Sequence, residues 1–207
     1  MLWGGAHGGL EVRREDDGSH RLRGRFPYNS EAVLSDGGRT GRPRKERIAP
    51  RAFAYRVDQD GEDIHLLVGH DYDHPLASRG TRTLMLRDSD EALTFEAIIT
   101  RAISETTHGR DALALIASGL AVGLSPGFRI PPERAVPDAE EVEEEEDRPE
   151  EGMHRAIIRT IKAALLFELS VVTRPAYSDA QIEARNWSLR PQVQMVLRSH
   201  HRRRWRV

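Results

Sequence analysis

Two short segments of the chain contain residue types used in nucleophilic hydrolysis. The run 123–127 (GLSPG) matches G-x-S-x-G, the turn that holds the nucleophilic serine of α/β-hydrolases. The segment 65–74 (HLLVGHDYDH) places His70 at the end of a predicted strand, where a neutral imidazole can accept the proton of a serine hydroxyl. Ser125 is therefore a candidate nucleophile and His70 a candidate general base.

The same histidine-rich segment also suggests a metal site. Imidazole and carboxylate groups are ordinary zinc ligands, and His65, His70, His74 and Asp73 lie close together in the sequence. Strand alternation puts His65 and His70 on opposite faces, which disfavours that set. A metal-dependent hydrolase at His70 and His74 stays open as an alternative, while our preferred interpretation needs no metal or cofactor.

An esterase of the α/β-hydrolase type is a second alternative, but the surrounding residues disfavour it. A helix is predicted before Ser125 and not after it, and Pro126 has no N–H to serve as the usual oxyanion donor. Such an esterase would need a strand, turn and helix around Ser125 and a later histidine, such as His154. A third alternative is a protein without enzymatic activity.

Hydrophobic periodicity predicts the elements that would position these residues. Alternation over 62–70 puts Ile64, Leu66, Val68 and His70 on one face of a strand. A turn leading into a short helix is expected at 48–53, and a helix at 110–120 with Asp111 as its N-cap. Further strands are predicted at 81–87, 92–101, 154–161 and 164–173, and a last short helix at 177–185.

The predicted strand 164–173 contains a carboxylate in a mostly apolar row. Period-two alternation gives Glu168 the same face as Leu166, Ser170 and Val172. A carboxylate in such a place could orient a catalytic histidine, or it could form a structural ion pair.

Composition excludes several classes of protein. The 207 residues include no cysteine, which rules out a disulfide scaffold, a thiolate metal site and a cysteine nucleophile. No stretch approaches the ~20 apolar residues of a membrane span, and residues 1–10 lack the apolar core of a secretion signal. We therefore expect a cytosolic protein with no membrane partner, and its net charge of −2 gives no reason to expect nucleic acid.

Four blocks, in order, resemble the prohead maturation proteases of tailed phages. They are 46–53 (ERIAPRAF), 67–71 (LVGHD), 116–128 (IASGLAVGLSPGF) and 168–177 (ELSVVTRPAY), within a resemblance that spans about residues 21–185. Each block is weak alone, but the four in this order with suitable spacing are specific. Two features depart from the family pattern, namely Pro126 after the serine and an acidic insert at 137–151.

The resemblance implies a serine endopeptidase related in fold to the herpesvirus assemblins. That fold is mixed α/β, a mostly antiparallel barrel-like sheet with a few flanking helices. By the resemblance, Ser125 is the nucleophile, His70 the base and Glu168 the third member. Assemblins use a second histidine in the third role, so His108 is the alternative, while Asp71 should point away from the ring of His70.

The resemblance also implies a substrate and a place of action. The substrate would be the scaffold protein or the scaffolding segment of the major capsid protein, cleaved inside the procapsid in the host cytoplasm. A homo-oligomer is left open, and the non-enzymatic alternative becomes a capsid or scaffold component.

Two charged runs complete the expected organisation of the chain. Residues 140–151 contain nine acidic residues, and 187–207 contain six arginines and no acid; such runs are usually solvated. We therefore expect an N-terminal segment, 1–25, that is flexible or an edge strand. The catalytic domain is expected at 26–186 with an acidic loop at 137–151, followed by a basic tail at 187–207.

Overall fold

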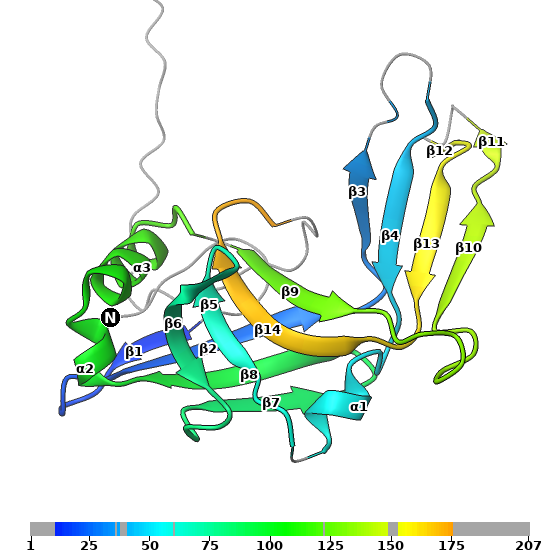
Figure 1. Cartoon of the computed structure of the whole chain (residues 1–207). Helices are drawn as coiled ribbons and strands as arrows, with labels where there is room; N and C mark the ends of the chain where they lie inside the picture. Colours follow the sequence, from blue (N-terminus) through cyan, green and yellow to red (C-terminus); the bar gives the residue numbers. More distant parts are fainter. Residues whose placement is uncertain are drawn as a thin grey trace, which may run out of the picture.

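The computed structural model describes residues 11–35, 37, 41–59, 61–121, 123–148 and 153–175. Strands in these residues form three four-stranded sheets and a two-stranded ribbon, accompanied by short helices (Figure 1). The mixed α/β class with few helices is confirmed and most strand pairs are antiparallel, but the described strands form separate sheets and not a closed barrel. The predicted helix at 177–185 and the basic tail at 187–207 lie outside the described residues.

The first sheet, which we call the base sheet, is antiparallel throughout. The predicted hairpin of 81–87 and 92–101 is confirmed as two of its strands, with Ser89 N–H donating to the Ala92 carbonyl at 3.1 Å across the turn. Residues 11–25 contain the edge strand of this sheet and most of the strand that pairs with it. In spatial order, the strands are β1 (Glu11–Arg14), β2 (His20–Pro27), β8 (Ala92–Ile99) and β7 (Leu84–Asp88).

The second sheet carries the candidate residues, and we call it the site sheet. Its strands in spatial order are β6 (Asp71–Ser78), β5 (His65–Val68), β14 (Leu165–Val172) and β9 (Gly123–Arg129). The central pair, β5 and β14, is parallel, and the two outer pairs are antiparallel. Segments about a hundred residues apart in the sequence therefore lie side by side.

The third sheet projects from the other two, and we call it the wing sheet (Figure 1). It consists of β10 (Glu140–Glu144), β13 (Ile157–Ile161), β4 (Arg44–Ile48) and β3 (Glu31–Ser35), and the ribbon of β11 (Asp147–Arg148) and β12 (Met153–His154) lies beside it. Residues 140–144 of the expected acidic loop at 137–151 thus form a strand, although all five of their side chains are exposed, as expected for a solvated run.

Basic side chains from neighbouring strands explain why so acidic a run forms a strand. Alternate strand residues project to opposite faces, so the carboxylates of β10 reach cations on both faces of the sheet. Their charge repulsion is offset by pairing, although each exposed pair contributes little to stability alone. The pairs are Glu140 with Arg159, Glu141 with Lys162, Glu143 with Arg47 and Glu144 with Arg42.

The helices are short, and the last two begin at threonines whose hydroxyls cap them. They are α1 (Ala54–Val57), α2 (Arg101–Ser104) and α3 (Thr107–Ala117). The helix predicted at 110–120 exists as α3 but begins earlier, because the Thr106 hydroxyl accepts a hydrogen bond from Gly109 N–H at 3.1 Å and acts as the N-cap in place of Asp111. Within the described residues, no helix is long and apolar enough to cross a membrane.

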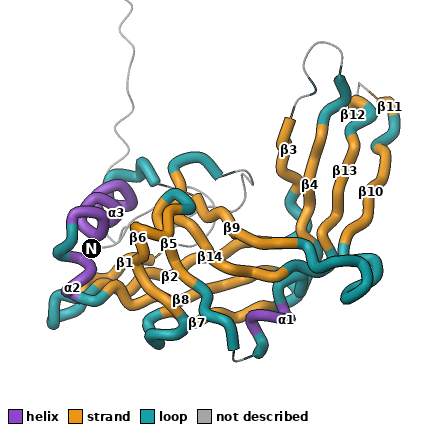
Figure 2. The backbone as a smooth tube through the Cα atoms, viewed as in Figure 1, coloured by secondary structure: helices purple, strands orange, loops and turns teal. Residues whose placement is uncertain are grey.

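Figure 2 shows the base sheet and the site sheet lying against each other. Buried residues of both sheets belong to one hydrophobic core. Leu22 and Phe26 of β2 are buried in it together with Leu66 of β5 and Leu169 of β14. Phe53, at the start of α1, contacts a cluster of rings at the end of this core. Its ring centroid lies 6.5 Å from Phe26, 6.2 Å from Tyr28 and 5.7 Å from Phe128.

Phe53 should therefore be a large contributor to stability. It is 0% exposed, and we expect Phe53→Ala to lower the free energy of unfolding by about 3–5 kcal/mol because it leaves a cavity among packed rings. The matched control is Tyr55→Ala two residues later, at a side chain that is 65% exposed, which should change it by less than about 0.5 kcal/mol. Equal urea midpoints for the two variants would contradict this account of the core.

Candidate active site

A β-bulge in β14 decides which way its side chains point. Leu166 pairs with Phe128 and Glu168 with Gly127, so Phe167 is an extra residue on β14. As a result Leu166 and Leu169 both lie in the core, and Glu168 and Ser170 share the opposite face. The predicted apolar row of Leu166, Glu168, Ser170 and Val172 is therefore wrong, because alternation was assumed to be unbroken.

The bulged Phe167 side chain is held between two arginines. The guanidinium carbon of Arg56 lies 4.2 Å from the ring centroid, and that of Arg129 lies 5.2 Å from it. Cation–π attraction of this kind stabilises the ring where the strand is irregular. It thereby helps to maintain the bulge that turns Glu168 away from the core.

His70 lies in the two-residue turn between β5 and β6. Gly69 and His70 both have φ of +63°, as a tight hairpin turn of the I′ kind requires, and histidine is among the residues that tolerate this region best. The prediction that His70 closes a strand on its apolar face is thus wrong, since β5 ends at Val68. The turn lies against β14, where Gly69 N–H donates to the Val171 carbonyl at 3.0 Å (Figure 1).

The structure brings His70 and Glu168 into direct contact. His70 Nδ1 lies 2.6 Å from Glu168 Oε1, and the other carboxylate oxygen accepts a hydrogen bond from the Ser170 hydroxyl at 2.7 Å. The carboxylate side chain is 5% exposed, whereas the imidazole is 45% exposed. The buried carboxylate is thus in contact with Nδ1 of His70. The second ring nitrogen, Nε2, is left for a partner on the exposed side of the ring.

Ser125 lies on the next strand, β9. Its Cα pairs with that of Ser170 in the antiparallel register, so the two side chains are on the same face of the site sheet. Gly127, on that face too, pairs with Glu168 and leaves room for the carboxylate. Ser125 is within a strand that follows α3, so the strand–turn–helix required by the α/β-hydrolase alternative is absent from these described residues.

The remaining candidate residues have partners of their own. His74 Nδ1 lies 2.9 Å from Asp71 Oδ2, and His65 Nε2 lies 3.5 Å from Asp63 Oδ2. His108, in the first turn of α3, has its Nε2 at 3.0 Å from the Pro75 carbonyl.

These separate pairings disfavour the metal alternative. His70 and His74 each face a different carboxylate, and no group of three or more histidine, aspartate or glutamate side chains suited to a metal ion occurs in the described residues. The side chain of His154 is not among those described.

Tyr72 shows that the charge of Glu168 acts beyond the imidazole. The tyrosine ring lies at 5.7 Å from His65 and is largely exposed. Partial burial, and after it the negative charge of Glu168, raises the pKa of the Tyr72 hydroxyl.

The sequence reasoning did not recognise the parts played by Ser170 and Gly127. Ser170 is two residues from Glu168, and that spacing places both on one face of a strand whatever the bulge before them does. Gly127 could not have been singled out, because its role depends on the register between β9 and β14.

The space at Gly127 leads to a test of the His70–Glu168 contact. In Gly127→Ala the new methyl would lie 1.9 Å from Glu168 Oε1, so the carboxylate must move and its hydrogen bond to His70 should be lost. The readout is the His70 Nδ1 proton signal in ¹H NMR, expected far downfield in the native protein. Gly61→Ala, where nothing lies within 4 Å, should keep the signal; its survival in Gly127→Ala would contradict the geometry.

Comparison with known proteins supplies the identification. The chain matches the family model of the caudovirus prohead serine protease over residues 10–194, which is most of its length. No curated protein and no solved structure matches it significantly. The family predicted from the four motif blocks is confirmed, and the chain belongs to the caudovirus prohead serine proteases, a family of serine peptidases.

Proposed function

We propose that the protein is a prohead endopeptidase in which Ser125, His70 and Glu168 form the catalytic triad. Ser125 Oγ attacks the carbonyl carbon of the scissile peptide bond while His70 Nε2 takes its proton. The protonated imidazole then gives that proton to the leaving amine. Glu168 accepts a hydrogen bond from His70 Nδ1–H, which fixes the tautomer with Nε2 free and stabilises the imidazolium.

The observation that carries the proposal is the 2.6 Å contact between His70 Nδ1 and Glu168 Oε1. In a catalytic triad the acid is hydrogen-bonded to one ring nitrogen of the histidine, and this contact engages Nδ1 in that way. The exposed side of the ring is available to the nucleophile. Ser125 shares the face of Glu168 and Ser170, one strand away from the carboxylate. Nucleophile, base and acid come from three neighbouring parts of the site sheet.

Glu168 supports the third role better than the other candidates do. His108 is engaged with the Pro75 carbonyl, and its ring lies 5.4 Å from that of His74. Asp71, the first residue of β6, accepts a hydrogen bond from the Asp73 N–H and faces His74. Pro126 has no N–H, so the residue after the nucleophile supplies no oxyanion donor.

The substrate we propose is the scaffold protein or the scaffolding segment of the major capsid protein, cleaved inside the procapsid in the host cell. Membership of a prohead protease family supports this assignment. The catalytic domain we propose is 26–186, and the basic tail at 187–207 is an appendage to it. The fold relationship to the assemblins belongs to the same proposal.

Co-expression with the capsid and scaffold proteins tests the nucleophile. Ser125→Ala should abolish their cleavage while leaving the fold intact, because losing a serine nucleophile costs on the order of a million-fold in turnover. Cleaved termini are identified by mass spectrometry. The control is Ser118→Ala, at the exposed C-cap of α3, which should cleave normally. Undiminished processing by Ser125→Ala would overturn the assignment.

The third triad role has its own test. Glu168→Gln should lower turnover by up to about ten-thousand-fold, because the amide favours the wrong imidazole tautomer. The double variant with Ser125→Ala should be hardly worse than Ser125→Ala alone, since members of one catalytic unit are non-additive. His108→Ala is the comparison. A folded, active Glu168→Gln beside an inactive His108→Ala would transfer the role to the histidine.

A further inference from the structure

Ser170 is the residue through which the parts of the site meet. Its side chain is completely buried, with 0% exposure. Its hydroxyl donates to Glu168 Oε2 at 2.7 Å and accepts a hydrogen bond from the backbone N–H of His70 at 2.8 Å. A hydroxyl has one proton to donate, so this serine has none left for a second acceptor.

These two bonds control both ends of the hydrogen bond between Glu168 and His70. One fixes the free oxygen of the carboxylate, so the carboxylate plane is held at two points. The second bond, from the His70 N–H to the Ser170 hydroxyl, holds the backbone of the turn in place at His70. That residue has φ of +63°, a region that L side chains rarely adopt, so an anchor on its N–H matters more here than in a regular strand.

Ser170 also faces the nucleophile. Its Cα is the register partner of Ser125 Cα across β14 and β9. The Ser170 side chain therefore contacts both Glu168 and the turn that carries His70. Its strand position lies directly opposite Ser125. The hydroxyl is buried and its proton is committed to Glu168, so Ser170 itself is not a second nucleophile.

We infer that Ser170 is a positioning residue for catalysis, which acts through Glu168 and the His70 turn to align the imidazole with Ser125. This inference rests on the proposed triad and adds to it a fourth side chain that touches no substrate. A merely structural serine would contribute to stability alone. A positioning serine must change the reactivity of Ser125 through the acid.

The test measures how fast a fluorophosphonate probe inactivates the full chain, with the adduct located by mass spectrometry. In Ser170→Ala the maximal inactivation rate should fall by about 10- to 100-fold, as when the outer hydrogen-bonding partner of a metal-ligating side chain is removed. The probe concentration for half-maximal rate should stay unchanged, because the probe does not contact Ser170. Ser170→Thr, which keeps the hydroxyl, should recover most of the rate.

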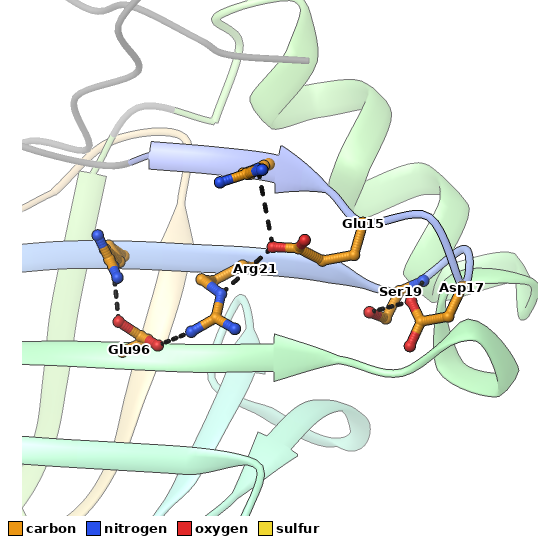
Figure 3. A network of polar contacts seen from close by, with 7 residues as sticks. Glu15, Asp17, Ser19, Arg21 and Glu96 are labelled. Carbon is orange, nitrogen blue, oxygen red and sulfur yellow. Dashed lines mark hydrogen bonds and ion pairs between the residues drawn. The ribbon is translucent and has the colours of Figure 1, made fainter.

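A matched control lies in the turn between β1 and β2, away from the site. Ser19 is also buried, and its hydroxyl donates to the carboxylate of Asp17 at 2.6 Å. Figure 3 shows the two side chains facing each other. Ser19→Ala removes the same kind of bond and should leave the inactivation rate at the native value. If Ser170→Ala does not fold, Ser170→Cys decides, since it keeps the size but donates weakly. It should show the same fall in rate.

A double variant separates positioning from stability. In a Glu168→Gln background, Ser170→Ala should reduce the rate far less than it does in the native chain, because both bonds of Ser170 act on the hydrogen bond between Glu168 and His70, which the glutamine has already disrupted. Native-rate labelling of Ser170→Ala, or an equal loss in both backgrounds, would overturn the inference and leave the triad standing. A native chain that is not labelled at Ser125 would instead overturn the triad itself.

Discussion

The short hydrogen bond between His70 and the buried carboxylate of Glu168 is the interaction on which the site depends. A carboxylate that is 5% exposed is costly to bury unless its oxygens are paired. Both oxygens are paired here, one with the imidazole and one with Ser170. The position of the imidazole in turn depends on the tight turn after β5, which is hydrogen-bonded to β14.

The parallel pairing of β5 with β14 sets the position of this turn. β5 and β14 run side by side with His65 opposite Glu168 and Val68 opposite Val171, so the turn after β5 begins beside Val171, where the His70 N–H can donate to the Ser170 hydroxyl. The same β14 pairs on its other edge with β9 and Ser125. Because the core faces of these strands pack on the base sheet, the register cannot shift by one residue without burying Glu168 in the core.

Much of this was readable from the sequence, and the failures have physical causes. Motif blocks gave the family, which is confirmed, and Ser125, His70 and Glu168 as candidates. The strand around Glu168, predicted at 164–173, was located nearly to the residue as Leu165–Val172, whereas no strand was predicted around Ser125, where β9 lies. The bulge at Phe167 was missed because period-two reasoning assumes regular pairing, and a bulge is set by the partner strand. The turn at Gly69 and His70 was likewise read as strand, although a glycine before the histidine is what such a turn needs. The acidic strand β10 was missed because its neutralising cations come from segments remote in sequence, such as Arg42 and Arg47.

The most direct measurement of the central claim is the position of the adduct formed by a fluorophosphonate on the native chain, compared with His70→Ala. A triad built on the His70–Glu168 hydrogen bond predicts a single adduct on Ser125, and almost none in His70→Ala because the serine then lacks its base. Mapping by tandem mass spectrometry gives the site and the extent together. An adduct on a different serine, or full labelling of Ser125 in His70→Ala, would contradict the account.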